Sequence, residues 1–320
     1  MRDIDSTENR QVQVEAEDHT EESSLVVGKS PTTMRKRIFI ILSLLSLYFL
    51  WGGTYLAMRI ALQGFPPFIL AGVRQLTAGL LLFVFLWLRK HELPTRKQWL
   101  TAIVVGGLLL VVGNGGVVFA EQWVSSGLAA LALGAIPLWA AVFSGLFGRW
   151  PSRIEWFGLG LGFSGLVLLN LENGLHANPL GAIVLFVAPI GWAFGSILRQ
   201  HLPSPKGLMA SSSQMVAGGV LLFIVGFGTG EHMTKLPGPG SLAAMAYLII
   251  GGSLIAFSAY GYLLRHVRPA LATSYAYVNP LVAVGLGVAL AGEQITMIGV
   301  LAMLTILSGV GLVSLGRDRR

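Results

Sequence analysis

Long uninterrupted blocks of apolar residues fill the sequence from Ile38 onward, and each block has the length that crosses a bilayer. About 20 apolar residues in a helix span the hydrocarbon core of a membrane. Inside lipid, backbone polar groups must be satisfied within the segment itself, which favours helices. We therefore predict an all-α integral membrane fold with ten transmembrane helices, at residues 38–62, 66–88, 98–120, 124–147, 154–171, 179–199, 208–228, 241–264, 269–290 and 294–315.

The composition excludes several other classes of protein. Charged residues make up 12% of the chain and hydrophobic residues 54%, whereas a soluble domain carries about 25% charged residues. The net charge of +7 is spread over short loops rather than gathered on one stripe, so no nucleic-acid partner is predicted. The chain has no cysteine, which excludes disulfides and thiolate metal sites. We predict no metal and no cofactor.

The charges of the loops predict an orientation, because Lys and Arg accumulate on the cytoplasmic side of short loops. One set of alternate loops and ends holds sixteen basic residues, whereas the other set holds only Lys235. Both termini are therefore predicted to be cytoplasmic in a multi-pass protein of the cell (inner or plasma) membrane. The sixteen are Arg35, Lys36, Arg37, Arg89, Lys90, Arg96, Lys97, Arg149, Arg153, Arg199, Lys206, Arg265, Arg268, Arg317, Arg319 and Arg320.

Residues 1–33 differ from the remainder of the chain. They contain eight acidic residues against Arg2, Arg10 and Lys29, and they lack a long apolar run. Such a composition is typical of a solvated, disordered segment. We expect a disordered acidic tail on the cytoplasmic side.

The two halves of the chain resemble each other. A shift of 143 residues places Pro137 on Pro280 and Ala129 on Ala272, and a shift of 144 places Gly165 on Gly309. We therefore expect two repeats of five helices, at residues 38–171 and 178–316. Because five is odd, the second repeat must enter the membrane from the opposite face. Inverted repeats are a recurrent design of transporters, with the substrate site at their interface near the midplane.

Several short motifs are spread along both halves of the chain. They are Leu50-Trp51-Gly52-Gly53-Thr54-Tyr55, Arg74, Gly113-Asn114-Gly115, Ala120-Glu121-Gln122, the stretch from Ala129 to Pro137, Asn279-Pro280 and Gly292-Glu293. Together these motifs resemble one known family, the drug/metabolite transporter (DMT) superfamily in its ten-helix branch with two EamA domains. The resemblance implies an inner or plasma membrane permease, often an exporter of amino acids or other metabolites, with a central cavity lined by helices 1, 3, 4, 6, 8 and 9.

Polar residues in the middle of a membrane helix are costly, so they are candidates for function. Asn114 lies mid-helix among glycines, and Tyr275 and Asn279 share one face of the ninth segment. Pro137 and Pro280 each remove a backbone hydrogen bond and can expose a carbonyl to a ligand. The alternative for the amides is an interhelical hydrogen bond, and for the prolines a packed kink.

Four aromatic residues lie well inside their segments and are predicted to line a substrate site: Trp51, Tyr55, Trp192 and Tyr260. The alternative is an interfacial aromatic belt. Arg74 lies deep in the second segment and needs a partner, for which Glu121, a carbonyl or a substrate carboxylate would serve. No Asp, Glu or His falls near the middle of any segment, so Glu121 is the one plausible carboxylate for proton coupling.

From these features we predict a secondary transporter, an exporter of a small metabolite such as an amino acid or a related zwitterion or anion, that works by alternating access. A channel, or a receptor or structural membrane protein, is the alternative. The chain lacks paired carboxylates in a helix and the nucleophile motif G-x-S-x-G, so no enzyme is predicted. The expected partners are the substrate and the lipid bilayer. Gly158 and Gly162 allow close helix contact, either inside the monomer or across a homodimer.

Overall fold

The computed structural model describes residues 31–123, 129, 132–171, 179–282 and 297–315. The chain divides into two compact units, residues 1–41 and residues 42–320. The expected acidic tail lies almost wholly outside the described residues, as do Gly292 and Glu293. The fold discussed below is that of the second unit.

All regular structure in the described ranges is helical. Three stretches of the longer helices have the wider π-helical winding, here labelled η1 to η3. The elements are α2 (Pro31–Ser46), η1 (Leu47–Trp51), α3 (Thr54–Ala61), α4 (Pro67–Leu88), α5 (Arg96–Gly106), η2 (Gly107–Gly115), α6 (Gly116–Ala120), α8 (Ile136–Leu146), α9 (Arg153–Leu171), α10 (Pro179–His201), α11 (Leu208–Gly228), α12 (Pro239–Tyr247), η3 (Leu248–Ile255), α13 (Ala256–His266), α14 (Pro269–Ala272) and α16 (Met297–Leu315).

Six of the described helices are long and apolar enough to cross a membrane, and two further apolar helices are shorter. The six are Met34–Ala61, Pro67–Leu88, Arg96–Ala120, Pro179–His201, Leu208–Gly228 and Pro239–His266. Parts of the predicted segments 124–147, 269–290 and 294–315 lie outside the described residues. A helical membrane fold is thus present, and the count of ten stays a prediction.

Local sequence signals explain where several helices begin. Prolines open α4, α12 and α14, where the missing N–H is not needed. Thr95 and Gln98 form a capping box at α5, in which each side chain accepts a hydrogen bond from the backbone N–H of the other residue. Ser152 and Glu155 form the same arrangement at the start of α9.

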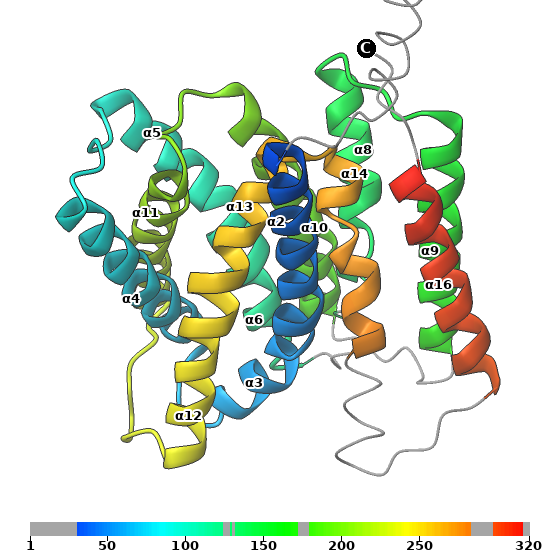
Figure 1. The fold of residues 1–320 in the computed structure, drawn as a ribbon. Helices are drawn as coiled ribbons and strands as arrows, with labels where there is room; N and C mark the ends of the chain where they lie inside the picture. The colour runs from blue at the N-terminus through cyan, green and yellow to red at the C-terminus, as the bar shows by residue number, and fades with distance from the viewer. Residues whose placement is uncertain (1–30, 124–128, 130–131, 172–178, 283–296, 316–320) are drawn as a thin grey trace, which may run out of the picture. The chain divides into compact units, whose positions relative to one another are not determined.

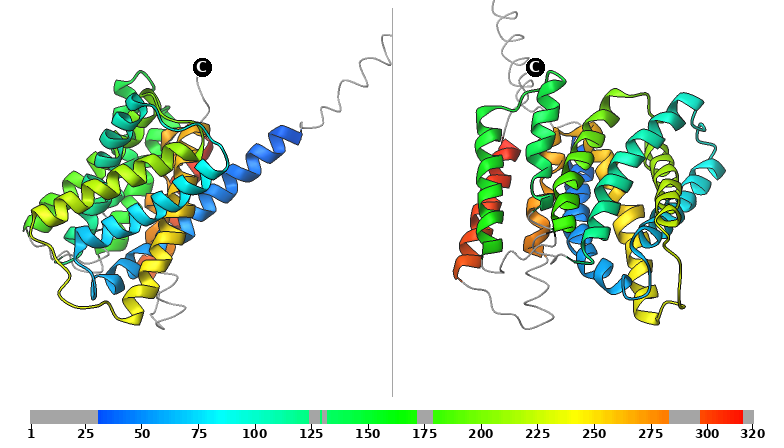
Figure 2. Two further views of the ribbon diagram at one scale, coloured as in Figure 1. Left: turned by 90° about the vertical axis from the view of Figure 1, so that its left-hand side faces the viewer. Right: turned by 180° about the vertical axis from the view of Figure 1, so that it is seen from behind.

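The two repeats pack against each other through corresponding helices. Helix α4 runs along α11, and α9 runs along α16 (Figure 1; Figure 2). The first contact is reciprocal: a Cβ at Gly79 would lie 2.7 Å from the backbone nitrogen of Val216, and one at Gly219 would lie 2.6 Å from that of Leu76. Reciprocal contacts of this kind are expected where a two-fold axis relates the two halves.

The glycines of the predicted close-contact motif are used inside the monomer. Gly158 and Gly162 of α9 both pack against Gly309 of α16, since a Cβ at Gly309 would lie 2.6 Å from the Gly158 carbonyl oxygen and 2.5 Å from the Gly162 backbone nitrogen. Close approach of backbones through small residues is the usual way in which membrane helices associate. A homodimer stays a prediction, and this motif is not available to build it.

Replacing Gly309 by alanine should therefore lower the stability of the protein. The new Cβ would lie 2.5 Å from the backbone nitrogen of Gly162, and overpacking of this kind costs about 1–3 kcal/mol. Gly160→Ala is the matched control, since a Cβ there meets no atom within 4 Å. Unfolding temperatures in detergent measure the difference, and equal temperatures for the two variants would contradict the tight contact of α9 with α16.

Candidate substrate-binding site

The three π-helical stretches meet at one buried cavity. Trp51 of η1, Asn114 of η2 and Gly252 of η3 all line it. A π turn is rare and is often found at functional sites, because the wider winding leaves backbone groups available. The cavity has a volume of about 50 Å³, and its lining consists of Trp51, Thr54, Tyr55, Met58, Arg74, Gln75, Gly113, Asn114, Val117, Leu133, Ile136, Trp192, Gly252, Phe257, Tyr275 and Asn279.

Most of the residues predicted for the site come together here. Trp51, Tyr55, Asn114, Trp192, Tyr275, Asn279 and Arg74 all line the cavity. Tyr260 is fully buried directly behind the lining, and its hydroxyl contacts the Trp192 indole nitrogen at 3.2 Å and the Ser196 hydroxyl at 2.6 Å. The structure adds a helix to the predicted junction, since Arg74 and Gln75 come from α4.

One wall of the cavity is aromatic: the rings of Trp51, Trp192 and Tyr275 line it, and the ring of Tyr260 packs directly behind them. The ring of Trp51 lies 4.6 Å from that of Tyr275, 5.4 Å from that of Tyr260 and 5.6 Å from that of Trp192, measured between centroids. Tilted and edge-to-face arrangements at these distances are favourable between aromatic rings. Trp51 belongs to the first half of the chain and the other three belong to the second, so this wall crosses the boundary between the halves.

Two of the predicted binding residues have polar groups that are already occupied. The Trp51 indole nitrogen donates to the carbonyl oxygen of Gly252 at 2.7 Å. With its amide oriented to satisfy its neighbours, Asn279 donates from its nitrogen to the carbonyl oxygens of Leu47, Tyr48 and Tyr275 at 3.1–3.2 Å. The hydrogen bonds of Trp51 and Asn279 each join η1 of the first half to a helix of the second half. These two side chains therefore hold the aromatic wall in place.

Arg74 carries the charge of the cavity. Its side chain is almost completely buried, and its Nε donates to the Ser253 hydroxyl at 2.9 Å. No carboxylate among the described residues lies within 4.0 Å of this guanidinium group, since the one ion pair found there joins Arg268 to Glu155. A buried cation without a counter-charge is costly unless a ligand supplies one.

Acceptor atoms without partners face the same region. Asn114 Oδ1 and Gln75 Oε1 are buried and make no hydrogen bond to any described residue. Leaving a buried acceptor unpaired costs about 1–3 kcal/mol. The cavity therefore combines one positive charge, two open acceptors and an aromatic wall.

Glu121 does not line the cavity. It directly follows the spanning helix that ends at Ala120, and neither carboxylate oxygen has a hydrogen-bond partner among the described residues. Burial raises the pKa of this carboxyl to about 8, against the opposing influence of Arg59 and Arg74. Its protonation can therefore change near neutral pH.

The two prolines differ in their surroundings. Pro137 stands in the first turn of α8, directly after a turn at residues 134–135. Pro280 lies inside the helical residues 275–282, and the ninth segment breaks earlier, at Thr273 and Ser274. The break that shapes this part of the site is thus one to two turns before the proline.

Sequence reasoning missed Gln75, Gly252 and Ser253, and it misplaced Arg199. Gln75 directly follows Arg74 in an apolar segment, and Ser253 interrupts an apolar run, so both left a visible signal. Arg199 was assigned to a cytoplasmic loop, which is wrong. It lies within α10, is 4% exposed, and donates from Nη2 to the Ser211 hydroxyl at 3.0 Å.

Comparison with known proteins identifies the chain. Its sequence matches the EamA-like transporter family over residues 38–171 and again over residues 179–315. The chain belongs to the EamA-like transporter family. It is thus a membrane transporter of the DMT superfamily, and the boundary crossed by the aromatic wall is that between two EamA repeats.

Individual relatives cover nearly the same region. The chain is 47% identical to the "Uncharacterized inner membrane transporter YedA" of Escherichia coli (strain K12), over 86% of this chain and 90% of that protein. It is 25% identical to the "Uncharacterized transporter YvbV" of Bacillus subtilis (strain 168), over 84% and 89%. It is 29% identical to "Protein PecM" of Dickeya dadantii (strain 3937), over 74% and 79%.

A solved structure shares the fold. A chain titled "Crystal structure of protein" superimposes with a TM-score of 0.70, covering 86% of this transporter and 97% of that chain, at 18% identity. This likeness concerns the EamA fold alone.

Two adjacent glycines of this EamA-like transporter offer a test of the geometry around Arg74. A Cβ at Gly252 would lie 2.7 Å from Arg74 Nη2 and 3.0 Å from the Thr54 methyl group, whereas one at Gly251 would approach nothing closer than 3.5 Å. Gly252→Ala should displace the guanidinium group and weaken its bond to Ser253, at a cost of about 1.5–3 kcal/mol. Gly251→Ala should change stability by under about 0.5 kcal/mol. Unfolding temperatures in detergent report both, and a stable Gly252→Ala protein would contradict the described position of Arg74.

Proposed function

We propose that this protein is a secondary transporter that exports a small amino acid or a related zwitterion or anion across the bacterial inner membrane by alternating access. The observation that carries the proposal is the Arg74 guanidinium group, which lines the aromatic cavity at the repeat boundary and has no carboxylate within 4.0 Å among the described residues. Both termini are proposed to be cytoplasmic, from the distribution of Lys and Arg over the loops.

The chemistry of the cavity favours a substrate with an acidic group. A carboxylate beside Arg74 would form a charge-assisted hydrogen bond and supply the missing counter-charge. The open acceptors Asn114 Oδ1 and Gln75 Oε1 suit an ammonium group of the same molecule. The aromatic wall suits an apolar side chain. An amino acid combines these three features.

The size of the cavity supports a mechanism with conformational change. A water molecule needs about 10–15 Å³ of such space, so 50 Å³ holds only a few waters. A metabolite needs more space than this, and rocking or gating of one repeat or helix bundle against another is the usual way for inverted-repeat carriers to open one side at a time. YedA is named as an inner membrane transporter, which supports the same location here.

The first experiment identifies the substrate class. Purified protein is heated with candidate amino acids, organic anions and organic cations, because a ligand that binds the folded state raises the unfolding temperature. We expect stabilisation by amino acids or anions. Preferential stabilisation by organic cations would contradict the proposed substrate class.

The role of Arg74 is tested with a matched pair of variants. Arg74→Gln removes the cavity cation, whereas Arg59→Gln removes an exposed guanidinium group of α3 that does not line the cavity. Loss of a charge-assisted bond worth about 1.5–3 kcal/mol weakens binding about 10- to 150-fold. We expect this loss in Arg74→Gln and little change in Arg59→Gln, measured as Kd for the stabilising ligand. Equal affinities of the two variants would remove Arg74 from the site.

The driving force is a separate question. Because Glu121, the one candidate for proton coupling, does not line the cavity, we propose exchange or facilitated movement as the mode of transport. In proteoliposomes, Glu121→Gln should retain substrate exchange, and an imposed pH gradient alone should not drive accumulation. Transport that strictly follows the pH gradient and disappears in Glu121→Gln would show proton antiport. Saturation and counterflow in the same vesicles distinguish a carrier from the alternative, a channel.

A further inference from the structure

A second cavity lies away from the central one and shares no lining residue with it. Its volume is about 730 Å³, and it is bounded by residues 141–155 on one side and by residues 265–270 on the other. These are the connection from α8 to α9 in the first EamA repeat, and the connection from α13 to α14 in the second. The loop charges place both connections on the cytoplasmic side.

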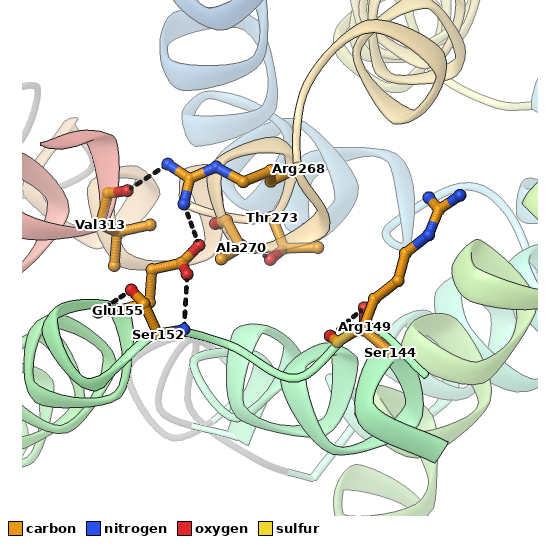
Figure 3. A network of polar contacts seen from close by, with 8 residues as sticks. All are labelled: Ser144, Arg149, Ser152, Glu155, Arg268, Ala270, Thr273 and Val313. Atoms are coloured by element: carbon orange, nitrogen blue, oxygen red, sulfur yellow. Dashed lines mark hydrogen bonds and ion pairs between the residues drawn. The ribbon is translucent and has the colours of Figure 1, made fainter. Parts of the chain in front are cut away.

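The lining of this cavity is strongly basic. Arg149, Arg153, Arg265 and Arg268 contribute to it, whereas Glu155 is the one acidic residue. The carboxylate of Glu155 is already engaged, since it pairs with Arg268 and accepts a hydrogen bond from the Ser152 backbone nitrogen at 2.8 Å (Figure 3). The cavity therefore has excess positive charge.

Two of these arginines differ from the others in that their side chains have no partner within the described part of the chain. Arg265 donates to the carbonyl oxygen of Pro205, and Arg268 donates to that of Val313. The guanidinium groups of Arg149 and Arg153 form no hydrogen bond or ion pair with any residue that the structure describes. Figure 3 shows the Arg149 side chain extending away from its backbone, apart from the Arg268–Glu155 pair.

The turn that presents Arg149 is fixed in shape. The Ser144 hydroxyl donates to the Arg149 carbonyl oxygen at 3.0 Å, and the Arg149 backbone nitrogen donates to the Ser144 carbonyl oxygen at 2.8 Å. Gly148 supplies the positive φ of +83° that this turn requires. The cation is thus held on an ordered scaffold.

Apolar side chains are exposed along the same segment. Leu146 is 70% exposed, Trp150 64% and Ile154 52%. Trp150 lies with its ring over the backbone of Gly145, and tryptophan is enriched where a protein meets the interfacial region of a bilayer. A hydrated inorganic anion would gain nothing from contact with these apolar side chains, whereas the acyl chains of an amphipathic ligand would pack against them.

We propose that this basic cavity binds the phosphate headgroup of an anionic phospholipid. Arg149 and Arg153 contact the phosphate oxygens, and the acyl chains lie on the apolar side chains of the same segment. Basic pockets between transmembrane helices on the cytoplasmic side are known to suit anionic headgroups. Arginine suits phosphate because its planar group donates two parallel hydrogen bonds. The proposal does not rest on the identity of the transported substrate.

The experiment uses the full-length protein in detergent, with phosphatidylglycerol, phosphatidylcholine and inorganic phosphate as probes. Phosphatidylglycerol should raise the unfolding temperature in a saturable way, and the other two should not. In the double variant Arg149→Gln/Arg153→Gln, the phosphatidylglycerol concentration needed for half-maximal stabilisation should rise about 25-fold, since each arginine contributes about 5-fold. Arg96→Gln/Lys97→Gln is the matched control, because it removes two exposed basic residues from another loop on the same predicted side, and it should bind as the parent does.

Several outcomes would overturn the proposal. Equal stabilisation by phosphatidylglycerol and phosphatidylcholine would show that the site does not recognise the net negative charge of the lipid headgroup. Stabilisation by inorganic phosphate alone would make this a site for a free anion. Equal losses in the two double variants would indicate general electrostatic attraction. Should the glutamine variant fail to fold, Arg149→Lys/Arg153→Lys retains the charge, and it should bind more weakly than the parent because lysine lacks the paired donors; unchanged binding would then count against direct contact.

Discussion

In a bilayer, a backbone carbonyl that leaves its helical hydrogen bond must find another partner in the protein. Here the three π turns open the helical winding near one point, and for η1 and η3 a side chain of the opposite repeat donates to their carbonyl oxygens. The Trp51 indole donates to the Gly252 carbonyl oxygen of η3. The Asn279 amide donates to two carbonyl oxygens of η1. The repeats are therefore joined most specifically where their helices are least regular, and the central cavity lies there for that reason.

The same arrangement explains how a charged residue can be held near the centre of the fold. Arg74 passes close to Gly252, where a side chain would leave no space, and bonds to the neighbouring Ser253. The other repeat thus provides a glycine for the approach and a hydroxyl for one donor, but no carboxylate. A protein that needed Arg74 for stability alone would gain more from a fixed acid, since an uncompensated buried charge is expensive. The absence of one beside Arg74 in the described residues leaves the charge available to a ligand.

The membrane helices, the repeats and several site residues can be predicted from the sequence, whereas the π turns and the burial of Arg199 cannot. The length of the apolar blocks and the charges of alternate loops indicate membrane helices. The match of Gly165 with Gly309 at a shift of 144 residues indicates repeats. Both features can be predicted because they can be seen directly in the order of the residues. Trp51 and Asn114 could be placed in the site since they are polar or aromatic groups deep in apolar segments. The π turns could not be predicted, because their winding depends on partners from the other repeat. Arg199 was misplaced because position near a helix end does not reveal whether neighbouring helices cover it.

The ion pair between Arg268 and Glu155 places a further condition on any rocking motion. It joins the first turn of α9 to the turn before α14, and Arg268 also holds α16 through the Val313 carbonyl oxygen. Glu155 is largely buried, and removing one partner from such a pair costs about 3–5 kcal/mol. Helices α9 and α16 also touch along their glycines. This ion pair and the glycine contacts therefore hold α9, α14 and α16 together, whereas the aromatic wall of the central cavity is held by hydrogen bonds from Trp51 and Asn279 to backbone carbonyl oxygens. A motion that opens the cavity while α9, α14 and α16 move together breaks the weaker contacts and keeps the stronger ones.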